Sequence, residues 1–146
     1  MTLRILVPLD GSDRSFRALE TGLLRLAGAP GLSVTLFTVV HKGFEGAGED
    51  AIARFDEDEQ DEIFPTEESA RRMLERARQA CAKLGVPAVE RVVVGSYYDE
   101  ILRESAQHDL LLMHRLDPGE VREKLRGSRT ERLARNARTS VLLVDA

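Results

Sequence analysis

The residues around Asp10 are of types that bind a nucleotide or a cation. Asp10 follows an apolar run and precedes Gly11 and Ser12, a pair typical of a tight turn. A carboxylate in this place could accept hydrogen bonds from a ribose hydroxyl or hold a cation. It could equally assist Ser12 in capping the helix that follows, since Asp and Ser are both preferred at helix N-caps. The sequence leaves both roles open.

A second stretch carries features of a phosphate-binding loop. Gly127 and Ser128 precede a helical pattern, and the free N–H groups at a helix start attract anions. Ser128 has a competing structural role, because it forms an S-x-x-E capping box with Glu131. Residues 115–138 carry eight basic and four acidic residues. Five of the basic ones could form an anion site: Arg115, Arg122, Lys124, Arg126 and Arg129.

The chain offers little for catalysis. Its histidines are His41, His108 and His114. A histidine paired with Asp10 or Asp117 could act as a general base. No G-x-S-x-G nucleophile motif is present, and no ligand spacing is typical of zinc. We therefore predict no enzymatic activity and no metal site, and keep slow nucleotide hydrolysis as the enzymatic alternative.

The apolar segments of the chain supply a scaffold for these residues. Strand-sized apolar runs occupy residues 3–9, 32–40, 89–95, 109–114 and 140–145. Most are continuous in Val, Ile and Leu, as is typical of strands buried on both faces of a parallel sheet. Helical patterns lie between them, after the potential N-caps Ser12, Thr66, Ser96 and Ser128. The alternation predicts a doubly wound α/β fold with a parallel sheet.

This scaffold determines where a ligand would lie. In open parallel sheets, ligands bind at the carboxyl ends of the strands, where the strand order reverses. If the first and fourth strands flank that point, Asp10 and residues 113–117 come together there. The helix after Thr66 should face the sheet with an apolar side: Ala70, Met73, Leu74, Ala77, Cys81 and Leu84. Cys81 is therefore predicted to be a core residue rather than a nucleophile.

Composition limits the class of protein. The chain has 146 residues, 42% hydrophobic and 32% charged, which suits a single domain over residues 1–146. The net charge of −4 argues against general nucleic-acid binding, which requires a basic surface. The single cysteine rules out an intramolecular disulfide. No signal peptide or membrane-length apolar run is present, so we expect a cytoplasmic protein without a membrane partner.

One acidic segment, residues 41–65, interrupts the alternation of strands and helices. Between Glu45 and Glu62 there are nine acidic residues and one basic residue, Arg54. We interpret the segment as a solvated, mobile insertion, with a lid or partner-docking segment as the alternative. Its spacing does not match the D-x-D-x-D-G calcium loop, so no calcium site is predicted.

Several motifs together resemble the universal stress protein family. They are RILVPLDGS with the amphipathic helix after it, VVVGSYYDEIL, DLLLMH and the closing GSRTERLARNARTSVLLVD. These motifs follow one another in the family's order and cover nearly the whole chain apart from the acidic insertion. The resemblance implies a five-stranded, adenine-nucleotide alpha hydrolase-like fold with strand order 3-2-1-4-5 and helices on both faces. Some members of that family bind ATP between the first and fourth strands, and others do not, so the resemblance implies a candidate nucleotide site at this place.

The ATP-binding members of that family carry a glycine motif that is incomplete here. The motif reads Gly, two residues, Gly, nine residues, Gly, then Ser or Thr. Counting back from Gly127 places the first two glycines at His114 and Asp117. The imidazole fills space that a ligand would need. The charge of the aspartate repels a phosphate group of a polyanion by at most roughly 4 kcal/mol at an effective dielectric constant of about 20. The resemblance therefore implies a weakened or lost ATP pocket.

The resemblance and the strand ends together give our predicted nucleotide-binding positions. They are Pro8, Asp10, Val39, Met113, His114, Asp117, Gly127, Ser128 and Arg129. We predict a non-enzymatic regulatory protein of the stress-response type, and keep a functional sensor that binds Mg-ATP as the alternative. The last strand ends the chain at a predicted sheet edge, where an apolar strand invites pairing. A homodimer through residues 140–145 is therefore expected.

Overall fold

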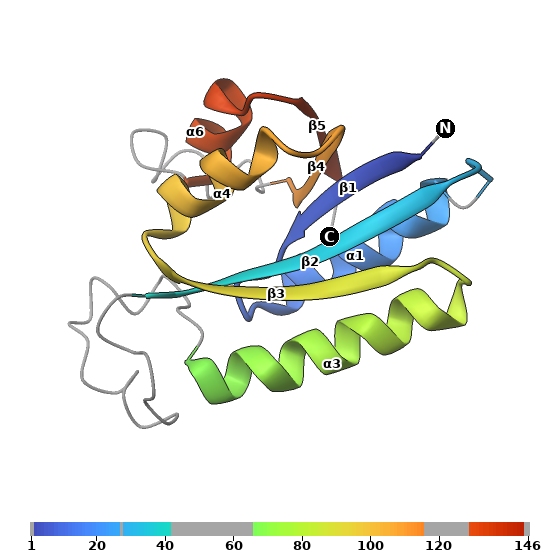
Figure 1. The fold of residues 1–146 in the computed structure, drawn as a ribbon, viewed down its shortest axis with the longest axis horizontal. Helices are drawn as coiled ribbons and strands as arrows, with labels where there is room; N and C mark the ends of the chain where they lie inside the picture. Colours follow the sequence, from blue (N-terminus) through green and yellow to red (C-terminus); the bar gives the residue numbers. More distant parts are fainter. Residues whose placement is uncertain (1, 27, 42–65, 116–128, 145–146) are drawn as a thin grey trace.

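The computed structural model describes residues 2–26, 28–41, 66–115 and 129–144. Their strands form one parallel sheet in the order β3-β2-β1-β4-β5 (Figure 1). The strands are β1 (Leu3–Pro8), β2 (Leu32–His41), β3 (Ala88–Gly95), β4 (Leu110–His114) and β5 (Ser140–Val144). The helices are α1 (Asp13–Leu26), α3 (Glu67–Lys83), α4 (Tyr97–Ser105) and α6 (Arg129–Asn136). The predicted fold class, strand order and strand positions are confirmed.

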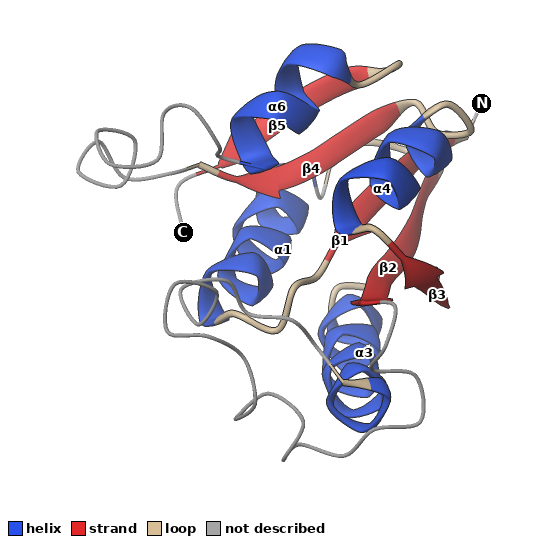
Figure 2. Ribbon diagram, turned by 90° about the vertical axis from the view of Figure 1, so that its left-hand side faces the viewer, coloured by secondary structure: helices blue, strands red, loops and turns tan. Residues whose placement is uncertain are grey.

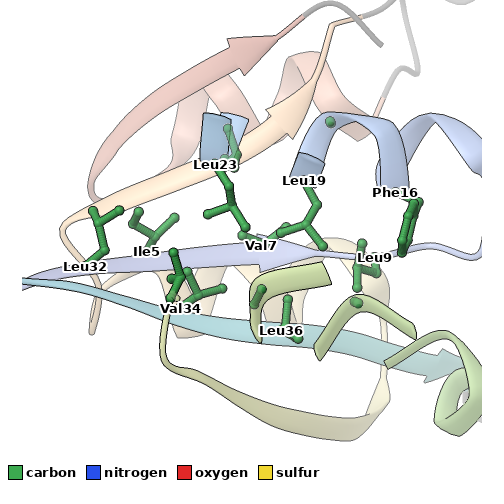
Figure 3. Packing of buried hydrophobic residues seen from close by; sticks show 14 of the residues in the cluster. Ile5, Val7, Leu9, Phe16, Leu19, Leu23, Leu32, Val34 and Leu36 are labelled. Carbon is green, nitrogen blue, oxygen red and sulfur yellow. The ribbon is translucent and has the colours of Figure 1, made fainter. Parts of the chain in front are cut away.

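Helices cover both faces of the sheet, with α1 and α3 on one side and α4 and α6 on the other (Figure 2). Alternate residues of β1 supply both cores, because successive side chains of a strand point to opposite faces. Ile5 and Val7 pack against Leu19 and Leu23 of α1 (Figure 3). Leu6 lies in the other core, whose buried members also include Phe37, Val39, Ile101, Leu111, Met113 and Leu133.

Local capping fixes where the helices begin. The Thr66 hydroxyl accepts a hydrogen bond from the Ser69 amide at 3.1 Å, and the Ser69 hydroxyl accepts one from the Thr66 amide at 2.9 Å. This capping box starts α3 where the sequence predicted it. Ser96 occupies the N-cap of α4 but makes no side-chain capping bond. Ser128 lies outside the described residues.

Two expectations about burial are wrong in detail. The third strand is an edge strand, and its valines are not buried on both faces: Val89 is 61% exposed and Val94 48%. An apolar run does not reveal which strand ends the sheet. Leu84 is 38% exposed because α3 ends before it, and Gly85 then turns the chain with a φ of 69°.

The described helices are also too short or too polar to span a bilayer. The acidic insertion lies outside the described residues, apart from His41, which ends β2. Its predicted role as a mobile segment or lid stays a prediction.

Candidate functional site

The strand order reverses between β1 and β4, and their pairing is short. β1 pairs with β2 on one side and with β4 on the other. The β1–β4 ladder pairs only Ile5 with Leu110 and Leu6 with Leu111, although β1 runs on to Pro8 and β4 to His114. We name the carboxyl ends of these two strands, with Asp10, Ser12 and His114, the β1–β4 junction. In doubly wound sheets this is the place where ligands bind.

Hydrogen bonds to the neighbouring strands hold the backbone on both sides of the junction. Beyond the end of β1, the Leu9 amide donates to the Phe37 carbonyl at 2.8 Å. The buried Thr38 hydroxyl donates to the Leu9 carbonyl at 2.7 Å. Beyond the end of β4, the Arg115 amide donates to the Val144 carbonyl of the next strand at 2.7 Å. The chain segments that carry Asp10 and His114 are therefore fixed before any ligand binds.

The turn after β1 uses one oxygen of Asp10 for structure. Gly11 adopts a φ of 90°, a conformation that side chains disfavour. Oδ1 of Asp10 accepts hydrogen bonds from the Ser12 amide at 2.8 Å and the Ser12 hydroxyl at 2.5 Å. The Ser12 hydroxyl in turn accepts one from the Ser15 amide at 3.1 Å, which caps α1. The capping role of Asp10 and Ser12 is thus confirmed, and Oδ2 of Asp10 remains for another contact.

Oδ2 of Asp10 faces the imidazole of His114. Nε2 of His114 lies 3.8 Å from Oδ2, an ion-pair distance rather than a hydrogen bond. The two side chains are only 14% and 13% exposed. Within the described residues, Nδ1 of His114 is buried without a hydrogen-bond partner. The junction therefore holds a carboxylate and an imidazole that are shielded from water, and Nδ1 of the imidazole has no partner within the described part of the chain.

The carboxyl group of Asp10 is ionised despite its burial. Burial on its own would raise the pKa of Asp10. The His114 imidazole and the Ser12 hydroxyl and amide together outweigh this and hold the pKa well below its ordinary value. The Asp10 carboxylate consequently carries a negative charge at neutral pH.

The structure divides the predicted nucleotide-binding positions into groups. Asp10 and His114 come together, as described above. Val39 and Met113 are 2% and 5% exposed and belong to the core beneath α4 and α6, and Pro8 is buried at the end of β1.

The remaining predicted positions are not described, or only in part. Asp117, Gly127 and Ser128 lie outside the described residues, and Arg129 begins α6 with its side chain not described. The binding roles of these positions stay predictions.

The other two histidines do not join this pair. His108 lies at the opposite end of β4, with Nδ1 3.0 Å from the Glu104 carbonyl and Nε2 3.0 Å from the Thr35 hydroxyl. His41 ends β2, and β1 lies between that strand and β4. Among the described residues, no group of three His, Cys, Asp or Glu side chains could hold a metal ion.

Thr38 is a residue of the site that sequence reasoning did not single out. Its buried hydroxyl positions Leu9, and so the turn that carries Asp10. A threonine inside a continuous apolar strand is a weak signal, because threonine is common in strands for its β-branched shape alone. Only the partner of its hydroxyl shows its role.

Comparison with known proteins agrees with the family resemblance seen in the sequence. The sequence model of the universal stress protein family matches residues 1–145. No curated protein shows significant sequence similarity to the chain.

Solved structures of universal stress proteins share the fold. One, described as a complex with cAMP, is 24% identical, with a TM-score of 0.69 over 97% of this chain and 96% of that chain. A family protein from Arabidopsis thaliana with AMP bound is 16% identical, with a TM-score of 0.67 over 98% of this chain and 91% of that chain. UspA from Lactobacillus plantarum is 19% identical, with a TM-score of 0.64 over 97% of both chains. At these identities the likeness shows the fold.

Proposed function

Because this chain belongs to the universal stress protein family, we propose that it is a non-enzymatic regulatory protein with little affinity for ATP. The observation that carries this proposal is the contact between Oδ2 of Asp10 and Nε2 of His114. It places an ionised carboxylate and a ring at the β1–β4 junction, the place where a nucleotide would bind.

Two effects of this pair oppose a triphosphate. A ligand phosphate about 4 Å from the Asp10 carboxylate would be repelled by at most roughly 4 kcal/mol at an effective dielectric of about 20. The His114 ring occupies a position that is glycine in the ATP-binding motif, so the backbone there is less accessible. A similar repulsion is predicted from the sequence for Asp117.

The ligands of the structural neighbours support an adenine-type ligand of lower charge. The neighbours described with cAMP and AMP carry a single phosphate. A ligand with one phosphate or none presents less negative charge to Asp10 than ATP does. We therefore propose that the junction keeps a ligand-binding role while discriminating against triphosphates.

The proposal is tested by thermal unfolding of the wild-type protein with and without millimolar Mg-ATP, and with AMP and adenosine in parallel. A ligand present at about 100 times its Kd stabilises the folded state by about 2.7 kcal/mol, which is readily seen as a rise in Tm. We expect no rise with Mg-ATP. A rise of several degrees with Mg-ATP would instead establish the protein as an ATP-binding sensor.

We also propose that the protein is a homodimer that pairs through β5. This strand is an edge of the sheet, and Leu143 on it is 40% exposed. A two-fold pairing of two such edges would satisfy their backbone groups and bury this leucine in both copies.

A further inference from the structure

β3 forms one edge of the sheet, and its outer side faces no other described strand (Figure 2). It pairs with β2 over eight consecutive residues, Ala88–Gly95, without a bulge and without a proline. Edge strands of natural proteins are usually short, or carry bulges, prolines or outward charges, because a free edge invites another strand. β5, the other edge, has only five residues. β3 is therefore a long edge whose regular backbone nothing interrupts.

The register with β2 shows which backbone groups of β3 face outward. The Val34 amide donates to the Pro87 carbonyl at 3.0 Å, where β3 begins. The N–H and C=O of one strand residue point to the same side, and those of the next residue point to the other, so the odd-numbered residues of β3 bond to β2. Glu90, Val92 and Val94 therefore point their N–H and C=O groups away from β2. An extended polypeptide is the ligand whose backbone groups repeat at this spacing.

The two charged residues of β3 are compensated within the chain. Glu90 forms an ion pair with Arg78 of α3 at 3.2 Å, and Arg91 forms one with Glu104 of α4 at 3.4 Å. Because α3 and α4 lie on opposite faces of the sheet, each charge is held against a helix of its own face (Figure 2). A charged residue of an incoming strand would lose water without gaining a free counter-charge on β3, so an uncharged strand fits this edge better.

Exposed valines give the edge its apolar character. Val89 shares the face of Arg91, and Val92 and Val94 share the face of Glu90, because successive side chains of a strand alternate. All three valines are exposed although they are large and apolar. β-branched side chains in a neighbouring strand would pack against them on both faces.

We propose that β3 is a docking edge for an extended segment of a partner protein, and that this segment is uncharged and rich in β-branched residues. The segment adds a strand to the sheet, with its backbone bonded to the even-numbered residues of β3 and its side chains packed against the exposed valines. β5 lies at the opposite edge, so the proposed homodimer leaves β3 free in both copies. The docking edge is separate from the β1–β4 junction and does not depend on which ligand binds there.

A synthetic peptide as long as β3, with alternating valine and threonine, is the probe. N-methylation of every second residue leaves one edge of this peptide able to form hydrogen bonds and prevents the peptide from associating with itself. The half-methylated peptide should bind the wild type saturably, as measured by the fluorescence anisotropy of a labelled copy. Hydrogen exchange at the Glu90 and Val92 amides should slow on binding, because these amides bond to the added strand. Matched peptides that are methylated at every residue, or that carry glutamate in place of valine, should bind about tenfold or more weakly.

Substitutions at Val92 test the same edge from the side of the protein. Val92→Pro removes an outward amide but no bond to β2, and it should weaken binding of the half-methylated peptide about tenfold or more. Val92→Thr keeps the amide and the β-branched shape, and should bind as the wild type does. Leu143→Glu, on the opposite edge, is the control and should also bind normally. Thermal unfolding checks that Val92→Pro is folded, and the methylated peptides test the edge in the unaltered protein.

A wild-type protein that does not bind the half-methylated peptide at millimolar concentration would overturn the inference. Equal binding of the half-methylated and fully methylated peptides would do the same, since backbone pairing would then not be the cause. Assembly of the protein beyond a dimer that Val92→Pro abolishes would also overturn it, because the occupant of β3 would then be a second copy of the chain.

Discussion

Nε2 of His114 lies 3.8 Å from Oδ2 of Asp10, and this contact joins the ends of two strands whose own ladder has already stopped at Leu6 and Leu111. The contact lies at the point where the sheet reverses its order. It also brings a shielded carboxylate and an imidazole together at the place where ligands bind in doubly wound sheets.

The Asp10→Asn substitution should destabilise the protein in a pH-dependent way. The pKa of Asp10 is lower in the folded than in the unfolded protein, so the carboxylate stabilises the fold above the unfolded pKa of about 3.9. We expect a loss of about 1–3 kcal/mol near neutral pH. The stabilisation is lost as the pH falls through the lower pKa of the folded state.

The measurement is urea unfolding of the wild type and Asp10→Asn at a series of pH values. The difference between their free energies of unfolding should be constant near neutrality and shrink below about pH 4. A difference that stays the same down to acidic pH, or that grows, would show that the carboxylate is not stabilised by its neighbours.

The Ser12→Ala substitution should cost about 1 kcal/mol of stability, because the hydroxyl caps α1 and also donates to Asp10. Ser96→Ala is a matched control, because Ser96 occupies the N-cap of α4 without a side-chain capping bond. Its replacement should change the free energy of unfolding by only about a few tenths of a kcal/mol. Chemical denaturation of both variants checks the difference. Equal effects would argue against the hydrogen bonds assigned to Ser12.

The Gly22→Ala substitution should destabilise the packing of α1 on β4. A methyl group at Gly22 would come within 2.5 Å of Cδ2 of Leu112, so the buried Leu112 side chain or one of the two elements must shift. Overpacking of this kind costs about 1–3 kcal/mol. The added Leu112→Val substitution should recover part of the loss.

Gly28→Ala controls for the general effect of replacing a glycine, since a methyl group at Gly28 meets nothing within 4 Å. Thermal unfolding should place Gly28→Ala close to the wild type and Gly22→Ala clearly below it. A Gly22→Ala protein as stable as the wild type would mean that α1 does not approach β4 this closely.

The Leu143→Glu substitution should weaken the proposed dimer. It places a charge on the edge strand β5, where two copies would meet around the two-fold axis. Val92→Glu is the control on the opposite edge of the sheet, since Val92 is 41% exposed and Leu143 40%. Light scattering at micromolar concentration should show a dimer for the wild type and Val92→Glu, and a monomer for Leu143→Glu. A monomeric wild type, or dissociation by Val92→Glu alone, would refute pairing through β5.

Much of the fold could be predicted from the chain because its strands are continuous apolar runs. Each of the five runs forms a strand within about one residue of its predicted bounds. The strand order came from the family resemblance, since the alternation of strands and helices does not by itself fix which strands are neighbours. The exposure of Val89 was not predicted, because its apolar run does not show that β3 lies at the edge of the sheet.

The site could be predicted only in part. Asp10 and His114 were expected at the same edge, because the carboxyl ends of parallel strands share it. Which ring nitrogen faces the carboxylate depends on side-chain torsions, and these carry no signal in a single sequence. For the same reason the buried Nδ1 of His114, which has no hydrogen-bond partner among the described residues, becomes visible only in three dimensions.

The most direct test of the account is a calorimetric titration of Mg-ATP into the wild type and into His114→Gly. The account predicts no saturable binding to the wild type at millimolar ATP and measurable binding to His114→Gly, because the substitution removes the ring and restores the glycine of the motif. Tight binding of Mg-ATP to the wild type that is weakened in His114→Gly would contradict it, since His114 would then be a contact for ATP rather than an obstacle.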